Sequence, residues 1–295
     1  MMPHQLNWQE ICQMIPKRKA DAQKGDFGRL LCITGSRNMP GACLLSTQAA
    51  LRGGAGLVTV ATAPENPMRL AAAAPEAMWL PLETDEAGFL RSSDQNRKTL
   101  EKQLSRANAV LLGCGLGVTE ETRRLVHWVL EQAVCPVVLD ADGLNCAVSC
   151  IELSRRTGKD WILTPHPGEM ARLTGRSIPQ IQENRVETAT QFAAAYPVTL
   201  ALKGAGTLVA QGSRLAQNPT GNPGMSRGGS GDVLAGLIAA FAAQGIPSWE
   251  AACAGVYLHG LAGDAAAAAL SQQAMLPRDL LVYLPQVLVK LEQER

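Results

Sequence analysis

The stretch NPTGNPGMSRGGSGDVLAG, residues 218–236, is the part of this sequence that says most about its fold. Its run of glycines ends at Asp232, and apolar residues then recur at the i, i+3, i+4, i+7 spacing of a helix with one buried stripe. These residues are Leu234, Leu237, Ile238 and Phe241. Gly245 and Pro247 predict the end of the helix. The segment therefore predicts a glycine-rich turn that opens directly into a helix.

Such a turn has a chemical consequence. The first backbone N–H groups of a helix have no partners within it and lie at the positive end of its dipole, where a phosphate group fits. Asp232 falls at this place, where its carboxylate could take a proton from an attacking hydroxyl. The alternative is a tight loop that only needs glycine backbone angles. Several glycines closed by an Asp and a helix favour the phosphate site.

The composition predicts one large domain and argues against several classes of function. The chain has 295 residues, of which 46% are hydrophobic and 18% charged, and no linker divides it, so we expect a single domain over residues 1–295. A net charge of +1 without a long basic run argues against nucleic acid as a partner. No apolar stretch predicts a membrane span, and residues 1–10 lack the apolar core of a signal peptide.

The eight cysteines follow no disulfide or zinc-site spacing. Cys146 and Cys150 could be read as a metal pair, but no second Cys/His cluster lies near them in the sequence. We therefore expect reduced thiols and a cytoplasmic protein.

Short apolar runs alternate with helical patterns along most of the chain. Six runs have the composition of strands buried on both faces: residues 29–34, 57–62, 109–112, 136–140, 161–164 and 198–203. Helical patterns between them, such as residues 42–52, predict an α/β fold with a doubly wound, mainly parallel central sheet flanked by helices. Residues 207–210 and 214–217 predict a small hairpin near one edge. The polar residues 82–98 are expected to form a surface excursion.

Ligands of such sheets bind beyond the carboxyl ends of the strands, and glycine-rich motifs follow two of the predicted strands. In residues 34–42, Gly35 and Gly41 allow backbone to approach a ligand, and Ala42 would present its N–H at a helix start. An ordinary strand-to-helix connection explains this motif equally well. The cluster at residues 113–117 is weak evidence by itself, because glycine-rich turns follow many parallel strands.

Charged groups follow two further strands. Asp140 and Asp142 could hold Mg²⁺ through water, or cap the next helix; we assign the cap to Asp142 and a site role to Asp140. His166 lies between two prolines, which make a stiff strand exit and predict a side chain directed into a cleft. Glu169 is expected either to bind Mg²⁺ through water or to cap the helix that follows it.

Lys203 follows the strand predicted at residues 198–203 and precedes two glycines, which suits a phosphate grip; a surface lysine in a hairpin turn is the alternative. No P-loop is formed, because no Ser or Thr follows a Gly-Lys pair and no long helix begins there. His259 and Asp264 fall on a helix predicted over residues 251–270, without the spacing of a metal triad.

These motifs, in this order from Lys24 to about Asp264, resemble the signatures of the ribokinase-like superfamily. The longer form Asn-x-x-Gly-Asn-x-Gly-Met at residues 218–225, together with Thr-Pro-His at residues 164–166, is similar to the ADP-dependent NAD(P)H-hydrate dehydratases, which repair hydrated nicotinamide cofactors. The resemblance covers nearly the whole chain. It also suggests that residues 24–28 form a structural loop before the first strand that reaches toward phosphates.

The resemblance implies a role for each matching residue. Asp232 would be the catalytic base and contact the substrate. Further substrate contacts would come from Ala42, Gly115, Gly117 and His166. The adenine nucleotide would be bound by Lys203, Gly204, Ala205, Gly206 and Thr207 with Gly228, Gly229, Ser230 and Gly231. Mg²⁺ would be held by Asp140 and Glu169, through water.

The implied reaction dehydrates the S epimer of hydrated NADH or NADPH. The ring hydroxyl would attack the β-phosphate of ADP, or the γ-phosphate of ATP in some relatives, and the ring would then expel phosphate. The resemblance also implies a homotetramer and a separate epimerase acting in the same pathway.

Two positions depart from the pattern. Cys114 stands where the family usually has Pro, which loosens the turn but keeps its glycines, and Ser226-Arg227 replaces Ala-Thr. We expect Arg227 to add a cation beside the phosphate cradle.

Two other functions are compatible with parts of the sequence. A kinase of the same superfamily that phosphorylates a vitamin alcohol would share the glycine-rich turn. The prefix at residues 218–225 and the Thr-Pro-His motif favour the dehydratase. A non-catalytic nucleotide sensor would not need Asp232.

Overall fold

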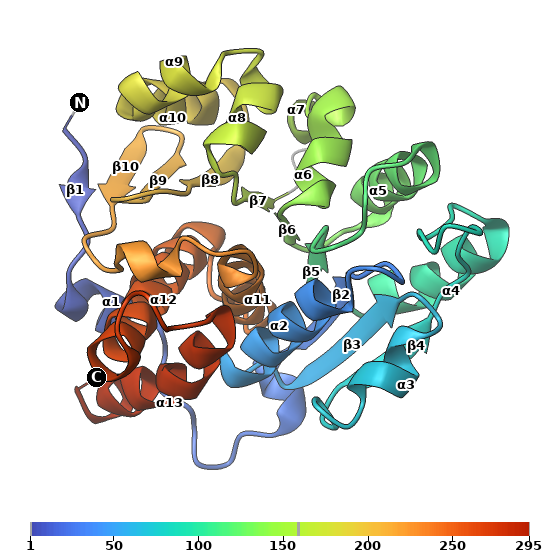
Figure 1. The fold of residues 1–295 in the computed structure, drawn as a ribbon, viewed down its shortest axis with the longest axis horizontal. Coiled ribbons are helices and arrows are strands. Elements are labelled where there is room, and N and C mark those ends of the chain that lie inside the picture. Colours follow the sequence, from blue (N-terminus) through green and yellow to red (C-terminus); the bar gives the residue numbers. More distant parts are fainter. Residues whose placement is uncertain (1, 158–159, 295) are drawn as a thin grey trace.

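The computed structural model describes residues 2–157 and 160–294. These residues contain one sheet of 10 strands, ordered β1-β10-β9-β8-β7-β6-β5-β2-β3-β4 (Figure 1). The strands are β1 (His4–Gln5), β2 (Arg29–Ile33), β3 (Leu57–Thr62), β4 (Met78–Pro81), β5 (Ala109–Leu112), β6 (Val137–Leu139), β7 (Trp161–Leu163), β8 (Val198–Leu202), β9 (Leu208–Gln211) and β10 (Arg214–Gln217). From β8 through β4 all neighbours are parallel, which confirms the doubly wound, mainly parallel sheet.

The hairpin is also confirmed, because β9 pairs antiparallel with both β8 and β10. It does not form the edge itself. The two-residue strand β1 pairs parallel with β10 and covers its outer side. This strand was not expected from the sequence, since His4 and Gln5 are polar and exposed.

The alternation of side chains along the strands builds two cores. Along β2, Leu30 and Cys32 pack on one face of the sheet, whereas Leu31 and Ile33 pack on the other. Both sets are almost fully buried. A strand that is buried on both faces has no solvent-facing position for a polar side chain, which explains the uninterrupted apolar runs in the sequence.

Helices cover both faces, and the two layers lie on opposite sides of the sheet in Figure 1. One layer contains α1 (Trp8–Met14), α2 (Pro40–Arg52), α3 (Asn66–Leu70), α11 (Ser230–Ala243), α12 (Ser248–Leu270) and α13 (Pro277–Glu294). The other contains α4 (Asp94–Leu104), α5 (Glu120–Gln132), α6 (Asp142–Ala147), α7 (Leu153–Thr157), α8 (Pro167–Thr174), α9 (Ile178–Glu183) and α10 (Arg185–Ala195). The described residues also contain the 3-10 turns η1 (Lys24–Phe27), η2 (Val148–Cys150) and η3 (Pro223–Met225).

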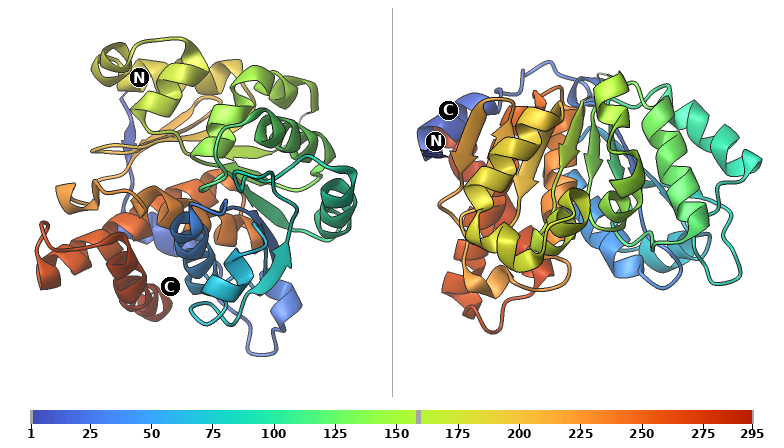
Figure 2. Two further views of the ribbon diagram at one scale, coloured as in Figure 1. Left: turned by 45° about the vertical axis from the view of Figure 1, so that its right-hand side comes forward. Right: turned by 90° about the horizontal axis from the view of Figure 1, so that it is seen from above.

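The helix after the glycine-rich turn is α11, and it lies in the middle of its layer. Twelve of its residues are buried, because α2 and α12 flank it and the sheet lies beneath it (Figure 2). Gly236 allows this packing: a Cβ there would lie 2.9 Å from the Cβ of Ala49 on α2. The small residues of α2 and α11 thus let the two helices approach closely.

The expected excursion at residues 82–98 is only partly correct. Residues 82–93 form a loop tied by an isolated bridge between Thr84 and Leu90, and α4 begins at Asp94. The Ser93 hydroxyl caps the first turn of α4, and Leu100 and Leu104 bury its inner face. The first turn of this helix is polar throughout, which is why the sequence pattern looked like a loop.

Within the described residues, no helix combines the length and the hydropathy required to cross a lipid bilayer.

Candidate functional site

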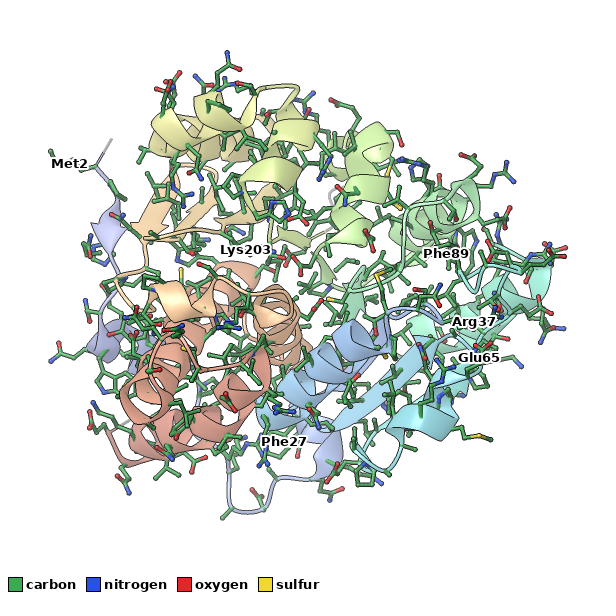
Figure 3. All side chains as sticks on the ribbon, in the orientation of Figure 1. Met2, Phe27, Arg37, Glu65, Phe89 and Lys203 are labelled. Carbon is green, nitrogen blue, oxygen red and sulfur yellow. The ribbon has the colours of Figure 1, made fainter. Side chains whose placement is uncertain are left out.

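The carboxyl ends of β6, β7 and β8 bring three polar side chains together. Lys203 Nζ lies 2.5 Å from Asp140 Oδ1, and the Thr164 hydroxyl donates to the same oxygen at 2.8 Å. Asp140 is only 2% exposed. Lys203 lies near the centre of the molecule, between the two helical layers (Figure 3). A buried carboxylate is costly unless it is paired, and here it is paired with a cation and a hydroxyl.

Lys203 also faces Glu169, whose Oε2 lies 3.8 Å from its ammonium. Burial by itself would lower the pKa of Lys203, but the attraction of Asp140 and Glu169 outweighs burial and raises the pKa. The lysine is therefore a fixed positive charge at neutral pH. Burial raises the pKa of Glu169 to about 7, against the opposing pull of Lys203.

The glycine-rich turn meets this charged group from the other side. Gly229 is the N-cap of α11 with φ of 106°, a left-handed conformation, and a Cβ there would lie 2.7 Å from the side chain of Leu45. A Cβ on Gly231 would lie 3.3 Å from Lys203 Nζ and 3.6 Å from Asp140 Oδ2. The free N–H groups of the first turn of α11 thus open beside a lysine ammonium, as an anion site requires.

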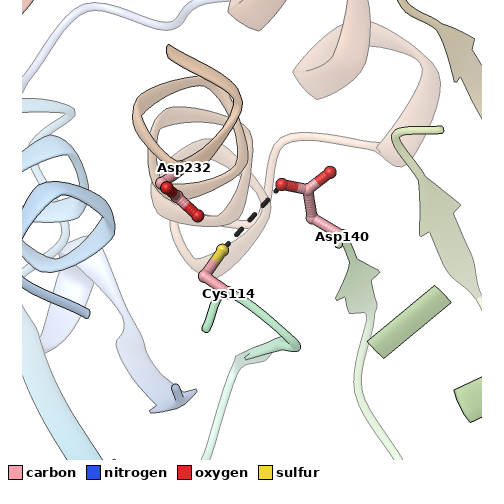
Figure 4. A group of neighbouring side chains, drawn as sticks. All are labelled: Cys114, Asp140 and Asp232. Carbon is pink, nitrogen blue, oxygen red and sulfur yellow. Dashed lines mark hydrogen bonds between the residues drawn. The ribbon is translucent and has the colours of Figure 1, made fainter. Parts of the chain in front are cut away.

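Asp232 is the third residue of α11 and points toward Asp140 and Cys114 (Figure 4). The ligand-type atoms of these three residues all lie within 4.8 Å of one another. Burial, reinforced by repulsion from Asp140, raises the pKa of Asp232 to about 6. No Lys, Arg or His within residues 2–157 and 160–294 forms an ion pair with Asp232. A carboxylate in this state is suited to accept a proton near neutral pH.

Carboxylate oxygens are the ligands that Mg²⁺ prefers, and the carboxylates of Asp140 and Asp232 each direct an oxygen into the space between them. Asp140 Oδ1 is taken by Lys203 and Thr164, whereas the one hydrogen-bond partner of Oδ2 among the described residues is the Cys114 thiol at 4.0 Å. The site can therefore accept a hard cation on the Oδ2 side. The Cys114 thiol adds nothing to such a site, because burial raises its pKa well above the ordinary value and keeps it protonated.

His166 and Glu169 form the start of α8. His166 is the N-cap: its Nδ1 accepts from the N–H groups of Gly168 at 2.9 Å and Glu169 at 3.3 Å. Glu169 Oε2 accepts from the His166 N–H at 2.8 Å, which completes a capping box. Of the two roles left open for Glu169, the structure therefore shows the cap. Its contact with Lys203 leaves a water-mediated role toward Mg²⁺ as a proposal.

These groups line a cavity of about 720 Å³, large enough for a nucleotide. The sequence-predicted residues that line it are Asp140, His166, Glu169, Lys203, Gly204, Ala205, Gly206, Thr207, Gly228, Gly229, Ser230, Gly231 and Asp232. A segment without sequence-assigned roles, residues 218–223, lines it as well. The motifs after three strands and the turn before α11 thus form one site.

The other three predicted substrate contacts do not line this cavity but lie together beside it. Ala42 is in the first turn of α2, and a Cβ on Gly115 would lie 2.9 Å from the Ala42 Cβ. A Cβ on Gly117 would strike the ring of Phe89, which belongs to the loop of residues 82–93. Cys114, next to Gly115, connects this second area to Asp140 and Asp232.

The loop of residues 82–93 is held over this second area by Arg37. The Arg37 N–H donates to the Gly88 carbonyl at 2.9 Å, and its guanidinium donates to the Glu86 carbonyl at 2.8 Å. The guanidinium also pairs with Glu65 at 2.7 Å, and the two residues lie side by side in Figure 3. The loop is therefore tied to the turn that precedes α2.

Two sequence-based expectations about these loops were wrong. Asp142 does not cap α6: the N-cap is Ala141, and Asp142 Oδ2 accepts from the Gly117 N–H at 2.8 Å, which joins two strand-end loops. Arg227 lines the cavity beside the glycine-rich turn, and its guanidinium donates to the Gln273 carbonyl in the segment before α13.

The loop of residues 24–28 does not approach the phosphate cradle. Its Gly28 packs against the backbone of Ala243, the last residue of α11, whereas Asp232 is in the first turn of that helix. Eleven residues of helix separate the two ends by about 16 Å. The loop contacts the far end of α11 because β2, which follows it, begins at the amino edge of the sheet.

Sequence reasoning missed the groups that hold residues 218–225 over α12. Asp264 on α12 accepts from the Gly221 N–H at 2.9 Å and from Asn222 Nδ2 at 3.0 Å. Asn218 Nδ2 donates to the Val256 carbonyl at 3.1 Å. The sequence offers a lone Asp late in an alanine-rich helix as the signal. The partners of this Asp are about 40 residues away in the sequence and cannot be identified without the fold.

The sequence analysis also assigned no role to His259, because its spacing does not form a metal triad. It is buried, and its Nε2 lies 3.0 Å from the carbonyl of Ser230, the first residue of α11. Burial lowers the pKa of His259 to about 4, so the ring is neutral and its N–H supports the turn.

Comparisons with known proteins agree with this geometry. The sequence matches the profile of the NAD(P)H-hydrate dehydratase family over residues 30–286. It is 43% identical over 281 residues to a bifunctional NAD(P)H-hydrate repair enzyme of Moorella thermoacetica, which covers 95% of this chain and 53% of that protein. The chain thus spans about half the length of the curated relatives of that kind.

Two further matches cover most of this chain and most of the protein that it matches. The chain is 38% identical over 252 residues to an ADP-dependent (S)-NAD(P)H-hydrate dehydratase of Neisseria meningitidis, with 84% of this chain and 80% of that protein covered. An ADP/ATP-dependent NAD(P)H-hydrate dehydratase of Bacillus subtilis, co-crystallised with ATP and Mg²⁺, has the same fold with a TM-score of 0.81 and 31% identity. That match covers 98% of this chain and 99% of that one. On its sequence, its ribokinase-like sheet and the placement of its motifs, the chain belongs to the NAD(P)H-hydrate dehydratase family.

Proposed function

We propose that the protein dehydrates the S epimer of hydrated NADH or NADPH and couples this to the conversion of ADP to AMP and phosphate. The observation that carries the proposal is the position of Asp232: a half-buried carboxylate with a pKa of about 6 that forms no ion pair within the described residues, at the start of a helix whose free N–H groups face Lys203. The family match and the (S)-NAD(P)H-hydrate dehydratase relative support the substrate class.

The first step would transfer a phosphoryl group. Asp232 takes the proton of the ring hydroxyl, and the oxygen attacks the β-phosphorus of ADP while the bond to the leaving AMP oxygen breaks. The N–H groups of Gly231 and Asp232 and the ammonium of Lys203 would stabilise the charge on the phosphoryl oxygens. Negative charge accumulates at the helix start in this step, which the helix dipole favours.

The second step would release the product. The ring carbon–oxygen bond breaks, the neighbouring ring carbon loses a proton to solvent, and the ring double bond of NADH or NADPH is restored. Phosphate leaves with the oxygen of the former hydroxyl, and it is a better leaving group than hydroxide. The overall change removes the elements of water from the ring and transfers its oxygen to phosphate.

Mg²⁺ would be held by Asp140 and Glu169, through water, near the carboxylate of Asp232. When bound, it would neutralise part of the charge on the nucleotide phosphates. We also propose that ADP or ATP occupies the cavity between residues 203–207 and 228–231, and that Ala42, Gly115, Gly117 and His166 contact the hydrated nicotinamide nucleotide.

The test is to incubate purified protein with hydrated NADH, Mg²⁺ and either ADP or ATP, and to follow the absorbance of reduced nicotinamide. The proposal predicts that absorbance returns only when nucleotide is present, with one phosphate released per NADH formed. ADP turnover that requires a small vitamin alcohol instead, with no recovery of NADH, would identify a kinase of the same fold. Nucleotide binding without any turnover would indicate a sensor.

We propose a homotetramer working beside a separate epimerase that interconverts the two epimers of the hydrate. The Moorella relative is named bifunctional and this chain covers about half of it, which supports the proposal of a separate epimerase.

A further inference from the structure

Arg185, the first residue of α10, lies directly beneath the turn that follows β8. Its Nη1 donates to the carbonyl of Lys203 at 3.0 Å, and its Nη2 donates to the carbonyl of Leu202 at 3.1 Å. One guanidinium therefore spans two successive carbonyls at the end of a strand. The planar fork of Arg is suited to such a two-point contact, which the single ammonium of Lys cannot reproduce.

The contact is close to the nucleotide cavity but on its outer side. Gly204, the next residue after Lys203, has φ of 143°, and a Cβ there would lie 2.5 Å from Arg185 Nη1. The glycine thus makes room for the guanidinium beneath the turn, while the turn itself lines the cavity. Arg185 does not line this cavity.

The backbone of Lys203 is held from two directions. Its N–H donates to the Pro165 carbonyl at 2.9 Å, and its carbonyl accepts from Arg185. Its side chain then reaches Asp140 at 2.5 Å and Glu169 at 3.8 Å. The two peptide groups on either side of the Lys203 Cα are therefore both held by hydrogen bonds, one from each direction.

Arg185 forms no ion pair in the described parts of the chain, although burial lowers the pKa of its guanidinium. A half-buried cation without a carboxylate is normally unfavourable, and here two carbonyls satisfy it. A side chain serving only to attach α10 to the sheet could be apolar, as Phe192 on the same helix is.

We propose that Arg185 is a positioning residue for the adenine nucleotide: it fixes the Lys203–Gly204 peptide so that the lysine ammonium and the following backbone are preset to receive the nucleotide phosphates. This inference rests on the proposed function in that it takes the cavity as the nucleotide site. It adds a residue outside the cavity that governs affinity through the turn.

The experiment measures ADP binding by calorimetry, with Mg²⁺ and full-length protein, alongside the melting temperature of the unliganded protein. Arg185→Met is expected to weaken ADP binding about tenfold or more, since two charge-assisted hydrogen bonds to the turn are lost. In steady-state assays the KM for ADP should rise by more than kcat falls. Arg185→Lys should recover only part of the affinity.

Arg176→Met is the matched control. Arg176 also holds a neighbouring part of α10, through Thr188 at 3.1 Å and Gln191 at 2.7 Å, but it does not touch the turn. It is expected to lower the melting temperature and to leave ADP affinity within about twofold of wild type.

Wild-type affinity in Arg185→Met, or an equal loss of affinity in Arg176→Met, would overturn the inference. Full recovery by Arg185→Lys would also contradict it, because charge alone would then suffice. If wild-type protein binds no ADP, the proposed nucleotide site itself is wrong, and the inference falls with it.

Discussion

The ammonium of Lys203 lies 2.5 Å from the carboxylate of Asp140, and this contact joins the ends of β8 and β6 across the intervening strand β7. The two residues are 63 positions apart in the sequence. The pair is nearly inaccessible, with side-chain exposures of 17% and 2%. The pair lines the cavity and supplies the positive charge opposite the start of α11.

Replacing one member of this pair should be more harmful than replacing both. Lys203→Met leaves the Asp140 charge buried without a cation, beside the Thr164 hydroxyl and the Cys114 thiol, and we expect a loss of about 3–5 kcal/mol of folding free energy at pH 7. The double variant Lys203→Met with Asp140→Asn should regain a large part of this loss. Urea unfolding of the single and double variants measures the difference. Equal stabilities for the two would show that the pair is not coupled.

The two adjacent glycines of the turn should respond differently to alanine. Gly229 has positive φ and would place a Cβ 2.7 Å from Leu45, so Gly229→Ala should cost about 1–3 kcal/mol of stability and disturb the start of α11. Gly228 has no atom within 4 Å of the Cβ position, so Gly228→Ala should unfold almost as wild type does. Thermal unfolding tests this, and a Gly228→Ala variant that loses as much stability as Gly229→Ala would refute the assigned geometry.

Asp264 should matter for binding as well as for folding. Asp264→Ala frees the Gly221 N–H and the Asn222 amide, and we expect a loss of about 1–2 kcal/mol together with a higher KM for nucleotide, because residues 218–223 line the cavity. Asp26→Ala is the matched control: Asp26 accepts from the Gln23 N–H at 2.7 Å in the loop at the opposite end of α11. It should lose stability without a change in KM. A normal KM in Asp264→Ala would show that this loop does not shape the nucleotide site.

The pH dependence follows from the raised pKa of Asp232. The base must be ionised to accept a proton, so kcat/KM should rise with pH and level off above an apparent pKa near 6. Glu169 contacts Lys203 and has a pKa of about 7, so it titrates in the same pH range as Asp232 and will broaden the transition. A rate that falls as pH rises from 5 to 7 would contradict the role of Asp232 as a base.

The same raised pKa has a consequence for stability, with the opposite sign. Asp232 has a folded-state pKa of about 6 against an ordinary value of 3.8, so it binds its proton more tightly in the folded protein. Its contribution to stability is therefore fully present below pH 3.8 and is lost as pH rises through about 6. Asp232→Asn should raise the melting temperature at pH 8 and have little effect at pH 4. A loss of stability at pH 8 would mean that the ionised carboxylate has a partner.

The parallel sheet could be predicted because its strands are buried on both faces, so that their sequences are short apolar runs ended by Gly, Pro or a charged residue. The short strand β1 and the polar start of α4 could not be predicted in this way. Strand β1 consists of two exposed polar residues, and its pairing with β10 is set by a contact more than 200 positions away. The beginning of α4 is polar and could only be recognised from the Ser93 cap.

The charged groups of the candidate site were predictable for a related reason: the topology places residues at strand ends and helix starts, and it brings Asp140, Lys203 and Asp232 together. What supports them was not predictable. Asp264, His259 and Arg185 each contact backbone groups, and carbonyls and N–H groups leave no trace in the sequence that would identify their partners. Asp142 was assigned to the wrong partner for the same reason, since the N–H of Gly117 competes with the helix start.

The measurement that tests the central claim most directly compares wild type with Asp232→Asn in a single turnover. Each protein is given hydrated NADH, ADP and Mg²⁺, and both the NADH absorbance and the AMP formed are followed, while ADP affinity is measured separately by calorimetry. We predict that Asp232→Asn forms neither NADH nor AMP at more than about a thousandth of the wild-type rate and still binds ADP within a fewfold of wild type. Wild-type rates in this variant, with ADP bound normally, would contradict the assignment of Asp232 as the base and the mechanism built on it.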